Sequence, residues 1–125
     1  HPVRVVGVVS SHATTYADSL AAGHVVEAPV TTQLADGMAC RVADAEALAV
    51  MAPHIDHIVQ VSDDEVAAAM RAIFTDTHNV AEGAGAAALA AALQERDALQ
   101  GQNVGLALTG GNVDAPMFAN TLAKH

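Results

Sequence analysis

Three stretches of the chain are almost continuously apolar, and each gives way to small or polar residues. They are VRVVGVV (residues 3–9), HIVQV (57–61) and NVGLAL (103–108). Short β-branched runs of this kind are typical of strands buried on both faces, as in parallel sheets. The pattern therefore predicts three buried strands. A further short edge strand is expected near Val25, in a segment that otherwise has the composition of a loop.

Between the first two stretches, the spacing of apolar residues predicts two helices. Tyr16 and Leu20 lie one helical turn apart, and Gly23 provides a stop for the first helix. Asp44 is placed to cap a second helix, which we expect to end before Pro53.

The clearest helix start is SDDE, residues 62–65. Ser62 followed three residues later by Glu65 forms a capping box, in which each side chain bonds the other residue's backbone N–H. The helix that follows is expected to bury one face, made of Val66, Met70, Ile73 and Phe74.

Two more helices are expected towards the end of the chain. EGAGAAALAAAL (82–93) begins one, with glycines at its start, and Asp114 can cap a last short helix that has Pro116 in its first turn. Strands that alternate with helices imply an α/β fold.

Composition narrows the function classes. The 125 residues suit one domain, and 52% of them are hydrophobic, which is enough for a core. A net charge of −9 and 2% aromatic residues argue against a nucleic-acid partner, which needs a basic patch or stacking side chains. No apolar run approaches the ~20 residues of a membrane span. The single cysteine fits a reducing compartment, so we expect a cytoplasmic location.

LTGGN (108–112) is the first candidate for chemistry, because ligands in open α/β sheets bind beyond the carboxyl ends of strands. Gly110 and Gly111 could simply form a tight turn after the strand. Alternatively, the Thr109 hydroxyl could bond a planar ligand that the glycines allow to approach closely. The residues alone leave both interpretations open.

Three other segments extend the pattern: TTQLADG (31–37), VSDDEVAAAM (61–70) and VAEGAGAAALAA (80–91). Together with LTGGN, and in this order, they resemble the C-terminal part of the threonine/serine dehydratase family. These are pyridoxal 5′-phosphate (PLP) enzymes of fold type II, a group that includes serine racemase. The resemblance implies an α/β fold that is part of the large PLP domain, with a mostly parallel sheet flanked by helices. It also implies that residues 1–125 are the C-terminal portion of the catalytic domain.

The same resemblance assigns cofactor-binding residues. It places the Thr109 hydroxyl opposite the pyridine nitrogen of PLP, where a neutral partner makes the cofactor a weaker electron sink, which suits β-elimination. Gly37, Glu82 and Gly110 are expected near the cofactor ring. From the residues alone, the two glycines could equally be turn residues, and Glu82 could be an acid favoured at a helix N-terminus.

The covalent chemistry of PLP needs a lysine, and the only one here is Lys124, near the chain end and without the family's lysine motif. In the family, that lysine and the glycine-rich phosphate loop lie upstream of the matched segment. We therefore expect no catalytic residue in this chain, and no activity from it alone.

Metal binding is not expected. Family members that bind a metal carry carboxylates where this chain has Val9 and Thr15, and Val9 offers no oxygen ligand. HIDH (54–57) has metal-ligand residue types but no evident third ligand. Cys40 follows LADGMA and could face the active-site cleft, although a buried, inert thiol is the interpretation favoured here.

The implied reaction is α,β-elimination of a β-hydroxy amino acid, such as threonine or serine, to a 2-oxo acid and ammonia. The partners expected are the amino acid substrate, the N-terminal portion of the same enzyme and further copies in a homo-oligomer. LADGMACR and DTHNVAEGAGAAALAA also look like a branch associated with hydroxyectoine utilisation. Two alternatives stay open: an amino-acid racemase of the same family, and a stand-alone, non-catalytic α/β binding module.

Overall fold

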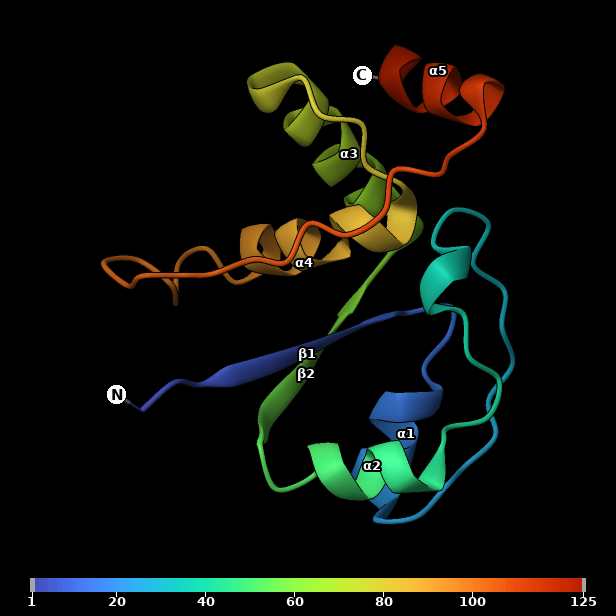
Figure 1. Cartoon of the computed structure of the whole chain (residues 1–125), viewed down its shortest axis with the longest axis vertical. Helices are drawn as coiled ribbons and strands as arrows, with labels where there is room; N and C mark the ends of the chain where they lie inside the picture. The colour runs from blue at the N-terminus through green and yellow to red at the C-terminus, as the bar shows by residue number, and fades with distance from the viewer. Residues whose placement is uncertain (1, 125) are drawn as a thin grey trace.

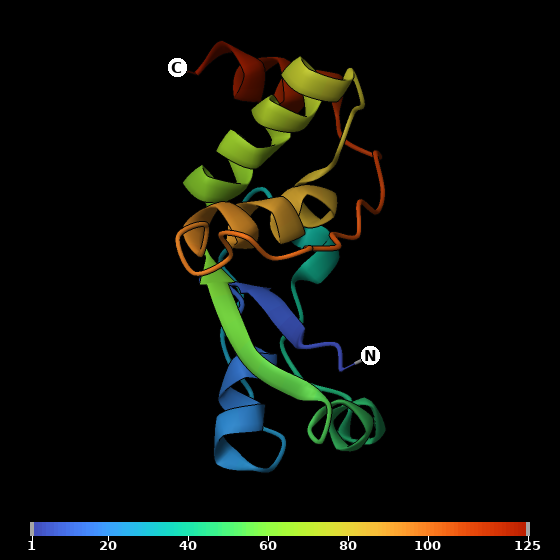
Figure 2. The ribbon, with the colours of Figure 1, turned by 90° about the vertical axis from the view of Figure 1, so that its left-hand side faces the viewer.

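The computed structural model describes residues 2–124 and arranges them in three layers (Figures 1 and 2). Two strands form the middle layer, with α1 and α2 on one side and α3, α4 and α5 on the other. The elements in chain order are β1 (Val5–Ser10), α1 (Thr15–Ala22), the 3₁₀ helix η1 (Asp36–Met38), α2 (Ala45–Met51), β2 (Ile55–Val61), α3 (Asp63–Thr77), α4 (Gly83–Gln94) and α5 (Ala115–Ala123).

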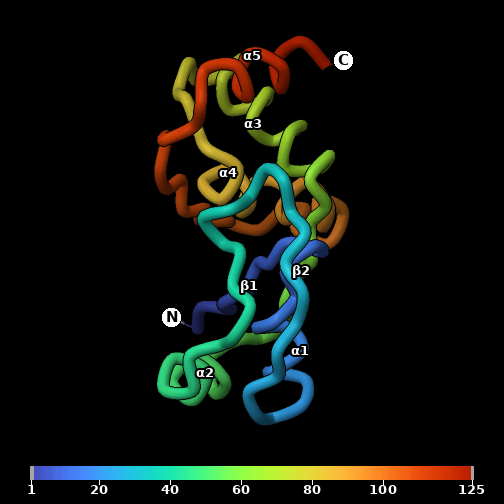
Figure 3. The backbone as a smooth tube through the Cα atoms, turned by 90° about the vertical axis from the view of Figure 1, so that its right-hand side faces the viewer, coloured from blue at the N-terminus to red at the C-terminus, as the bar shows by residue number. Residues whose placement is uncertain are grey.

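The two strands pair in parallel, as their apolar sequences predict. The register joins Val6 to His57 and Ser10 to Val61, with an irregularity between Val5 and Val6. Parallel strands need a long crossover. Here it runs through α1, η1 and α2, and Figure 3 shows the α1–α2 connection rising along one side of the sheet to the level of α4 and returning.

The prediction of a third strand is wrong. Residues 103–108 form no strand, and no backbone–backbone hydrogen bond joins them to any other part of residues 2–124. They run alongside α4 instead (Figure 1). A strand is held by ladder bonds to a neighbour, and the described part of the chain places no strand beside this segment.

The edge strand expected at Val25 is also absent from the structure of residues 2–124. Backbone groups of the adjacent Val26 are used by a side chain rather than by a sheet. The Val26 N–H donates to the Ser19 hydroxyl (2.9 Å), and that hydroxyl donates to the Val26 carbonyl (3.3 Å).

The expected helix ends are mostly confirmed. Gly23 ends α1 with a φ of 75°, and the Asp44 carboxylate accepts a bond from the Ala47 N–H (2.8 Å) at the start of α2. Asp114 is a partial correction, because it occupies the N-cap position of α5 but its side chain makes no capping bond. Proline does lie in the first turn of that helix, as expected.

The main core lies between β2, α3 and α4. Val66, Met70 and Ile73 of α3 are buried, as their spacing predicts, and α4 meets them with alanines. The prediction that Phe74 is buried is wrong, because its side chain is 36% exposed. It lies near the end of α3 and packs edge-on against Phe118 of α5, with ring centroids 5.5 Å apart.

The capping box at the start of α3 is present in full. The Ser62 hydroxyl accepts from the Glu65 N–H (3.2 Å), and the Glu65 carboxylate accepts from the Ser62 N–H (2.7 Å). That backbone bond, followed by a bond from the Gln94 side chain, holds the pKa of Glu65 below its ordinary value. The box therefore fixes the turn between β2 and α3 and ties it to the end of α4.

We expect Ser62→Ala to lower the free energy of unfolding by about 1 kcal/mol, the usual cost of losing an N-cap hydroxyl. Urea denaturation followed by circular dichroism measures this. Ser62→Thr keeps the hydroxyl and is expected to stay close to the original stability. If alanine and threonine variants unfold at the same urea concentration, the hydroxyl does not stabilise α3.

Candidate functional site

Two loops meet at the first turn of α4, and one of them is LTGGN. Glu82, the N-cap of α4, donates its N–H to the Gly110 carbonyl (3.1 Å). A Cβ added to Gly85 would lie 2.0 Å from the Thr109 carbonyl oxygen. The backbone of residues 109–110 therefore rests directly on the helix, at a distance that only glycine permits.

The other loop, LADG, packs against the same turn. A Cβ on Gly83 would lie 2.1 Å from the Leu34 carbonyl oxygen, and one on Gly37 would lie 2.9 Å from the Ala84 Cβ. Both loops are thus held against the N-terminal end of one helix. The structure brings together all four residues that the family resemblance assigned to the cofactor: Gly37, Glu82, Thr109 and Gly110.

The Glu82 side chain lies between the two loops. Its Oε1 would be 2.3 Å from a Cβ on Gly110 and 3.4 Å from a Cβ on Gly37. Gly110 has a φ of 36°, so a side chain there would be strained as well as crowded. The carboxylate makes no capping bond to α4, and it is left half-buried at a helix N-terminus, where negative charge is favoured.

Thr109 is exposed, and no hydrogen bond joins its hydroxyl to another of residues 2–124. The Thr109 backbone carbonyl, by contrast, packs against Gly85 of α4. The corner therefore offers a free hydroxyl, a carboxylate and two positions without side chains. These are features that suit a flat, polar ligand.

Asp63 fixes the LADG loop, a role that sequence reasoning did not identify. Its carboxylate accepts the Thr32 hydroxyl (2.6 Å) and the Gln33 N–H (2.8 Å). The Thr32 oxygen in turn accepts the Ala35 N–H (3.0 Å). The sequence offered one signal: SDDE has two acids, Asp63 and Asp64, beyond the two residues that its capping box uses.

The glycines of EGAG were recognised as a helix start, but their contacts were not foreseen. Alanine is the better helix former at such positions, and the chain uses alanine at most of the following ones. Two glycines in an otherwise alanine-rich first turn are the sequence signal for a close backbone approach.

The remaining candidates lie elsewhere. Lys124 lines a separate cavity of about 640 Å³ beside α3 and α5, together with Asp63 and Asp114. The prediction of a buried thiol at Cys40 is wrong, because this cysteine is exposed. Thr15 is buried, and its hydroxyl donates to the Arg41 carbonyl (3.2 Å). Among residues 2–124 no three histidine, cysteine or acidic side chains group as metal ligands would.

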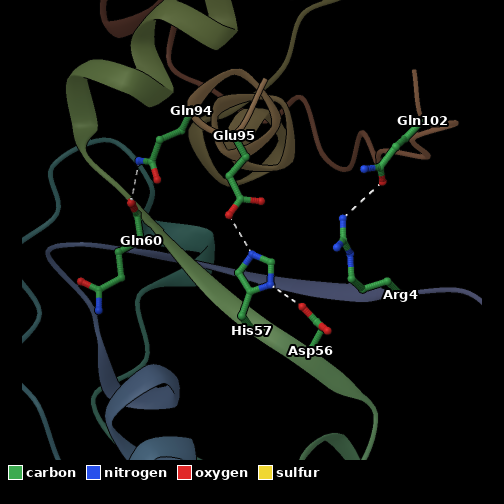
Figure 4. Close-up of polar contacts among 7 residues, drawn as sticks. All are labelled: Arg4, Asp56, His57, Gln60, Gln94, Glu95 and Gln102. Carbon is green, nitrogen blue, oxygen red and sulfur yellow. Dashed lines mark hydrogen bonds and ion pairs between the residues drawn. The ribbon is translucent and has the colours of Figure 1, made fainter. Parts of the chain in front are cut away.

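His57 of the HIDH segment joins two carboxylates instead (Figure 4). Its ring nitrogens lie 2.7 Å from the Asp56 carboxylate and 2.7 Å from the carboxylate of Glu95, the C-cap residue of α4. Hydrogen bonds to Asp56 and then to Glu95 raise the pKa of His57 above its ordinary value. The His57 ring therefore links β2 to the end of α4.

With this geometry in place, the family follows from comparison. The family model described as pyridoxal-phosphate dependent enzyme matches residues 1–110. The chain belongs to this family. It is 39% identical over 116 residues to an L-threonine ammonia-lyase of Geobacter sulfurreducens, covering 91% of this chain and 29% of that protein. It is 30% identical over 122 residues to an L-threonine ammonia-lyase of Thermotoga maritima, covering 98% and 30%.

Solved structures agree with the fold. A T.th. threonine deaminase superposes with a TM-score of 0.81 at 34% identity, covering 89% of this chain and 36% of that one. Maize serine racemase superposes with a TM-score of 0.82 at 26% identity, covering 96% and 38%. The expected α/β fold of type II PLP enzymes, with a parallel sheet and flanking helices, is confirmed. The chain spans about 30% of the length of these curated relatives. The link to a hydroxyectoine branch stays a prediction.

None of the helices in residues 2–124 has the length and apolar character required to cross a membrane.

We expect Gly85→Ala to lower the free energy of unfolding by about 1–3 kcal/mol, the usual cost of overpacking. The new methyl group would lie 2.0 Å from the Thr109 carbonyl oxygen, so a backbone must move. Gly105→Ala is the matched control, because a Cβ there meets nothing within 4 Å. Urea denaturation of both variants gives the comparison, and equal stabilities would show that the loop does not press on α4.

We expect part of the stability to be lost as pH rises, because the pKa of His57 is raised in the folded protein. This contribution is complete below the ordinary histidine pKa of about 6.5 and disappears as pH rises through the folded value. The measurement is the free energy of unfolding at about pH 6 and about pH 8, the range in which histidine titrates.

His57→Gln is expected to reduce that pH-dependent difference. His54→Gln is its matched control, because no hydrogen bond joins the His54 ring to another of residues 2–124. A difference that survives in His57→Gln would show that the two carboxylates do not hold a proton on this ring.

Proposed function

We propose that residues 1–125 form the C-terminal portion of the catalytic domain of a PLP-dependent ammonia-lyase. The reaction is the α,β-elimination of a β-hydroxy amino acid, threonine or serine, to a 2-oxo acid and ammonia. The observation that carries the proposal is the meeting of Gly37, Glu82, Thr109 and Gly110 at one corner. The proposal is supported by sequence identities of 39% and 30% to two L-threonine ammonia-lyases, over 91% and 98% of this chain.

The corner fits the flat cofactor of the family. The free Thr109 hydroxyl would meet the ring nitrogen of PLP, and Gly37 and Gly110 would present backbone without side chains to the ring. The Glu82 carboxylate would lie near the ring edge. When bound, PLP supplies an electron sink for the substrate's Cα. A neutral hydroxyl partner would leave that electron sink weak, so negative charge on Cα would be stabilised only briefly. Rapid loss of the β-hydroxyl is then favoured.

The lysine for the covalent bond would come from outside this chain. Lys124 lines the cavity beside α5, which neither Glu82 nor Thr109 lines. This chain then supplies the ring-nitrogen partner and one wall of the cofactor site, and the catalytic groups come from the rest of the enzyme. We also propose that the whole enzyme is a cytoplasmic homo-oligomer.

A racemase of the same family is the second candidate, favoured by the superposition on maize serine racemase. Elimination and racemisation both begin with loss of the Cα proton, and they differ in whether the β-hydroxyl then leaves. A stand-alone binding module is the third. It would contain the corner without a lysine beside the cofactor.

Substitutions of Thr109 in the full-length enzyme test the proposal. Thr109→Ser keeps the hydroxyl and is expected to retain most turnover of threonine and serine. Thr109→Val keeps the shape of the side chain but removes its hydroxyl, so the ring nitrogen would lose its hydrogen-bond partner. Leaving that nitrogen unpaired costs about 1–3 kcal/mol. The variant is therefore expected to weaken PLP binding roughly 5- to 150-fold. PLP titration by fluorescence, and assays for 2-oxo acid and D-amino acid, provide the readouts.

Equal PLP affinity in Thr109→Val and the unaltered enzyme would show that LTGGN is only a turn against α4. Formation of D-amino acid faster than 2-oxo acid would identify the racemase instead. Retention of PLP through a lysine of this chain would contradict the placement of the covalent site elsewhere.

A further inference from the structure

The LADG loop brings Gly37 to the corner, and one carboxylate attaches this loop to the rest of the protein. Within residues 2–124, the hydrogen bonds that join residues 32–40 to a part of the chain outside residues 31–40 are the two accepted by Asp63. The other hydrogen bonds of this stretch are local, such as those that close η1. The position of the loop therefore depends on Asp63 and on packing.

Thr32 converts this attachment into a loop conformation. Its hydroxyl donates to the Asp63 carboxylate (2.6 Å), and the hydroxyl oxygen accepts the Ala35 N–H (3.0 Å). Thr32 is 9% exposed and Ala35 is fully buried, so water cannot readily replace either bond. The turn from Thr32 to Ala35 is therefore set by the bond between Thr32 and Asp63.

The other side of the loop packs against α4. The Leu34 carbonyl oxygen would lie 2.1 Å from a Cβ on Gly83. Further along, η1 lies beside α4 (Figures 1 and 2), and a Cβ on Gly37 would lie 3.4 Å from the Glu82 carboxylate. The loop is thus held by α3 through Asp63 and by α4 through close packing. If the bond to α3 were lost, Gly37 would be free to shift relative to Glu82.

The capping box leaves Asp63 free for this role. Ser62 and Glu65 cap α3 between them, and Asp63 is the first residue of the helix but takes no part in the box. Asp64, next to it, is exposed, and no hydrogen bond joins its side chain to another of residues 2–124. Both aspartates have the same favourable place at a helix N-terminus. They differ in that Asp63 alone bonds the loop.

We infer that Asp63 is a positioning residue for the cofactor, which acts through Thr32 to hold Gly37 beside Glu82. Asp63 lines the cavity beside α5, which neither Glu82 nor Thr109 lines, so it acts through the loop and does not touch the ring. This inference rests on the proposed function in placing PLP at the corner. Loss of the bond should make the LADG loop more mobile and weaken PLP binding, although the Thr109 hydroxyl remains.

The test uses Asp63→Asn in the full-length enzyme. The amide oxygen of asparagine can accept one of the two loop bonds, but its NH₂ group only donates. Without PLP, we expect deuterium exchange in peptides covering residues 33–38, measured by mass spectrometry, to become roughly tenfold faster. We expect PLP affinity, titrated by fluorescence, to fall about tenfold. The circular dichroism band of the bound cofactor should also change, because the protein wall beside the ring is then mobile.

Asp64→Asn is the matched control, because it removes the same charge from the same turn of α3 without touching the loop. It is expected to keep the exchange rate, the PLP affinity and the dichroism band of the unaltered enzyme. Thr32→Val removes the hydroxyl and is expected to resemble Asp63→Asn, whereas Thr32→Ser keeps the hydroxyl and is expected to retain PLP affinity. Combining Asp63→Asn with Thr32→Val should weaken PLP binding no more than the stronger single variant, because both remove the same bond.

Unchanged loop exchange or unchanged PLP affinity in Asp63→Asn would overturn the inference. Equal effects of Asp63→Asn and Asp64→Asn would also overturn it, since the charge at the helix end would then be responsible. Thr109→Val separates this inference from the proposed function. If Thr109→Val weakens PLP binding and Asp63→Asn does not, the positioning role alone is wrong. If neither variant changes PLP affinity, the placement of the cofactor at this corner is wrong, and the positioning role is wrong with it.

Discussion

The first turn of α4 is where distant parts of the chain meet, and its two glycines set how closely they meet. Carbonyl oxygens of Leu34 and Thr109 lie where Cβ atoms of Gly83 and Gly85 would otherwise be. Each loop is then held against the same half-buried carboxylate, that of Glu82. If either glycine had a side chain, one loop would be pushed off the helix and the corner would open.

The rest of the fold serves to hold that turn in place. The alanine-rich face of α4 lets the helix approach β2 and α3 closely, so its position depends on tight packing rather than on large side chains. Gln94, at the opposite end of α4, donates to the Gln60 carbonyl (3.0 Å), as Figure 4 shows. It also donates to the Glu65 carboxylate (2.9 Å). The helix is therefore fixed at both ends, and its N-terminus is a rigid surface for the two loops.

Much of this could be predicted where the signal is local. The parallel strands and the capping box at Ser62 follow from residues close together in sequence, and the structure confirms them. The strand expected at 103–108 was wrong because a strand also needs a neighbour, which sequence periodicity does not reveal. The exposed Phe74 was missed because helical spacing indicates one face of a helix but not how far the neighbouring elements cover it. Cys40 was missed because the usual burial of cysteine, on which its prediction rested, says nothing of its place in this fold. Family resemblance, not spacing, brought Thr109 and Gly37 into one site.

The corner also has a consequence for the order in which the protein folds. It joins residues 34–37, 82–85 and 109–110, which are far apart along the chain. Closing long loops costs entropy that only later contacts repay. The helical pair α3 and α4, adjacent in sequence, can dock first, and the two loops can then settle onto the exposed end of α4. We expect the corner to be among the last parts of the native structure to form and among the first to open.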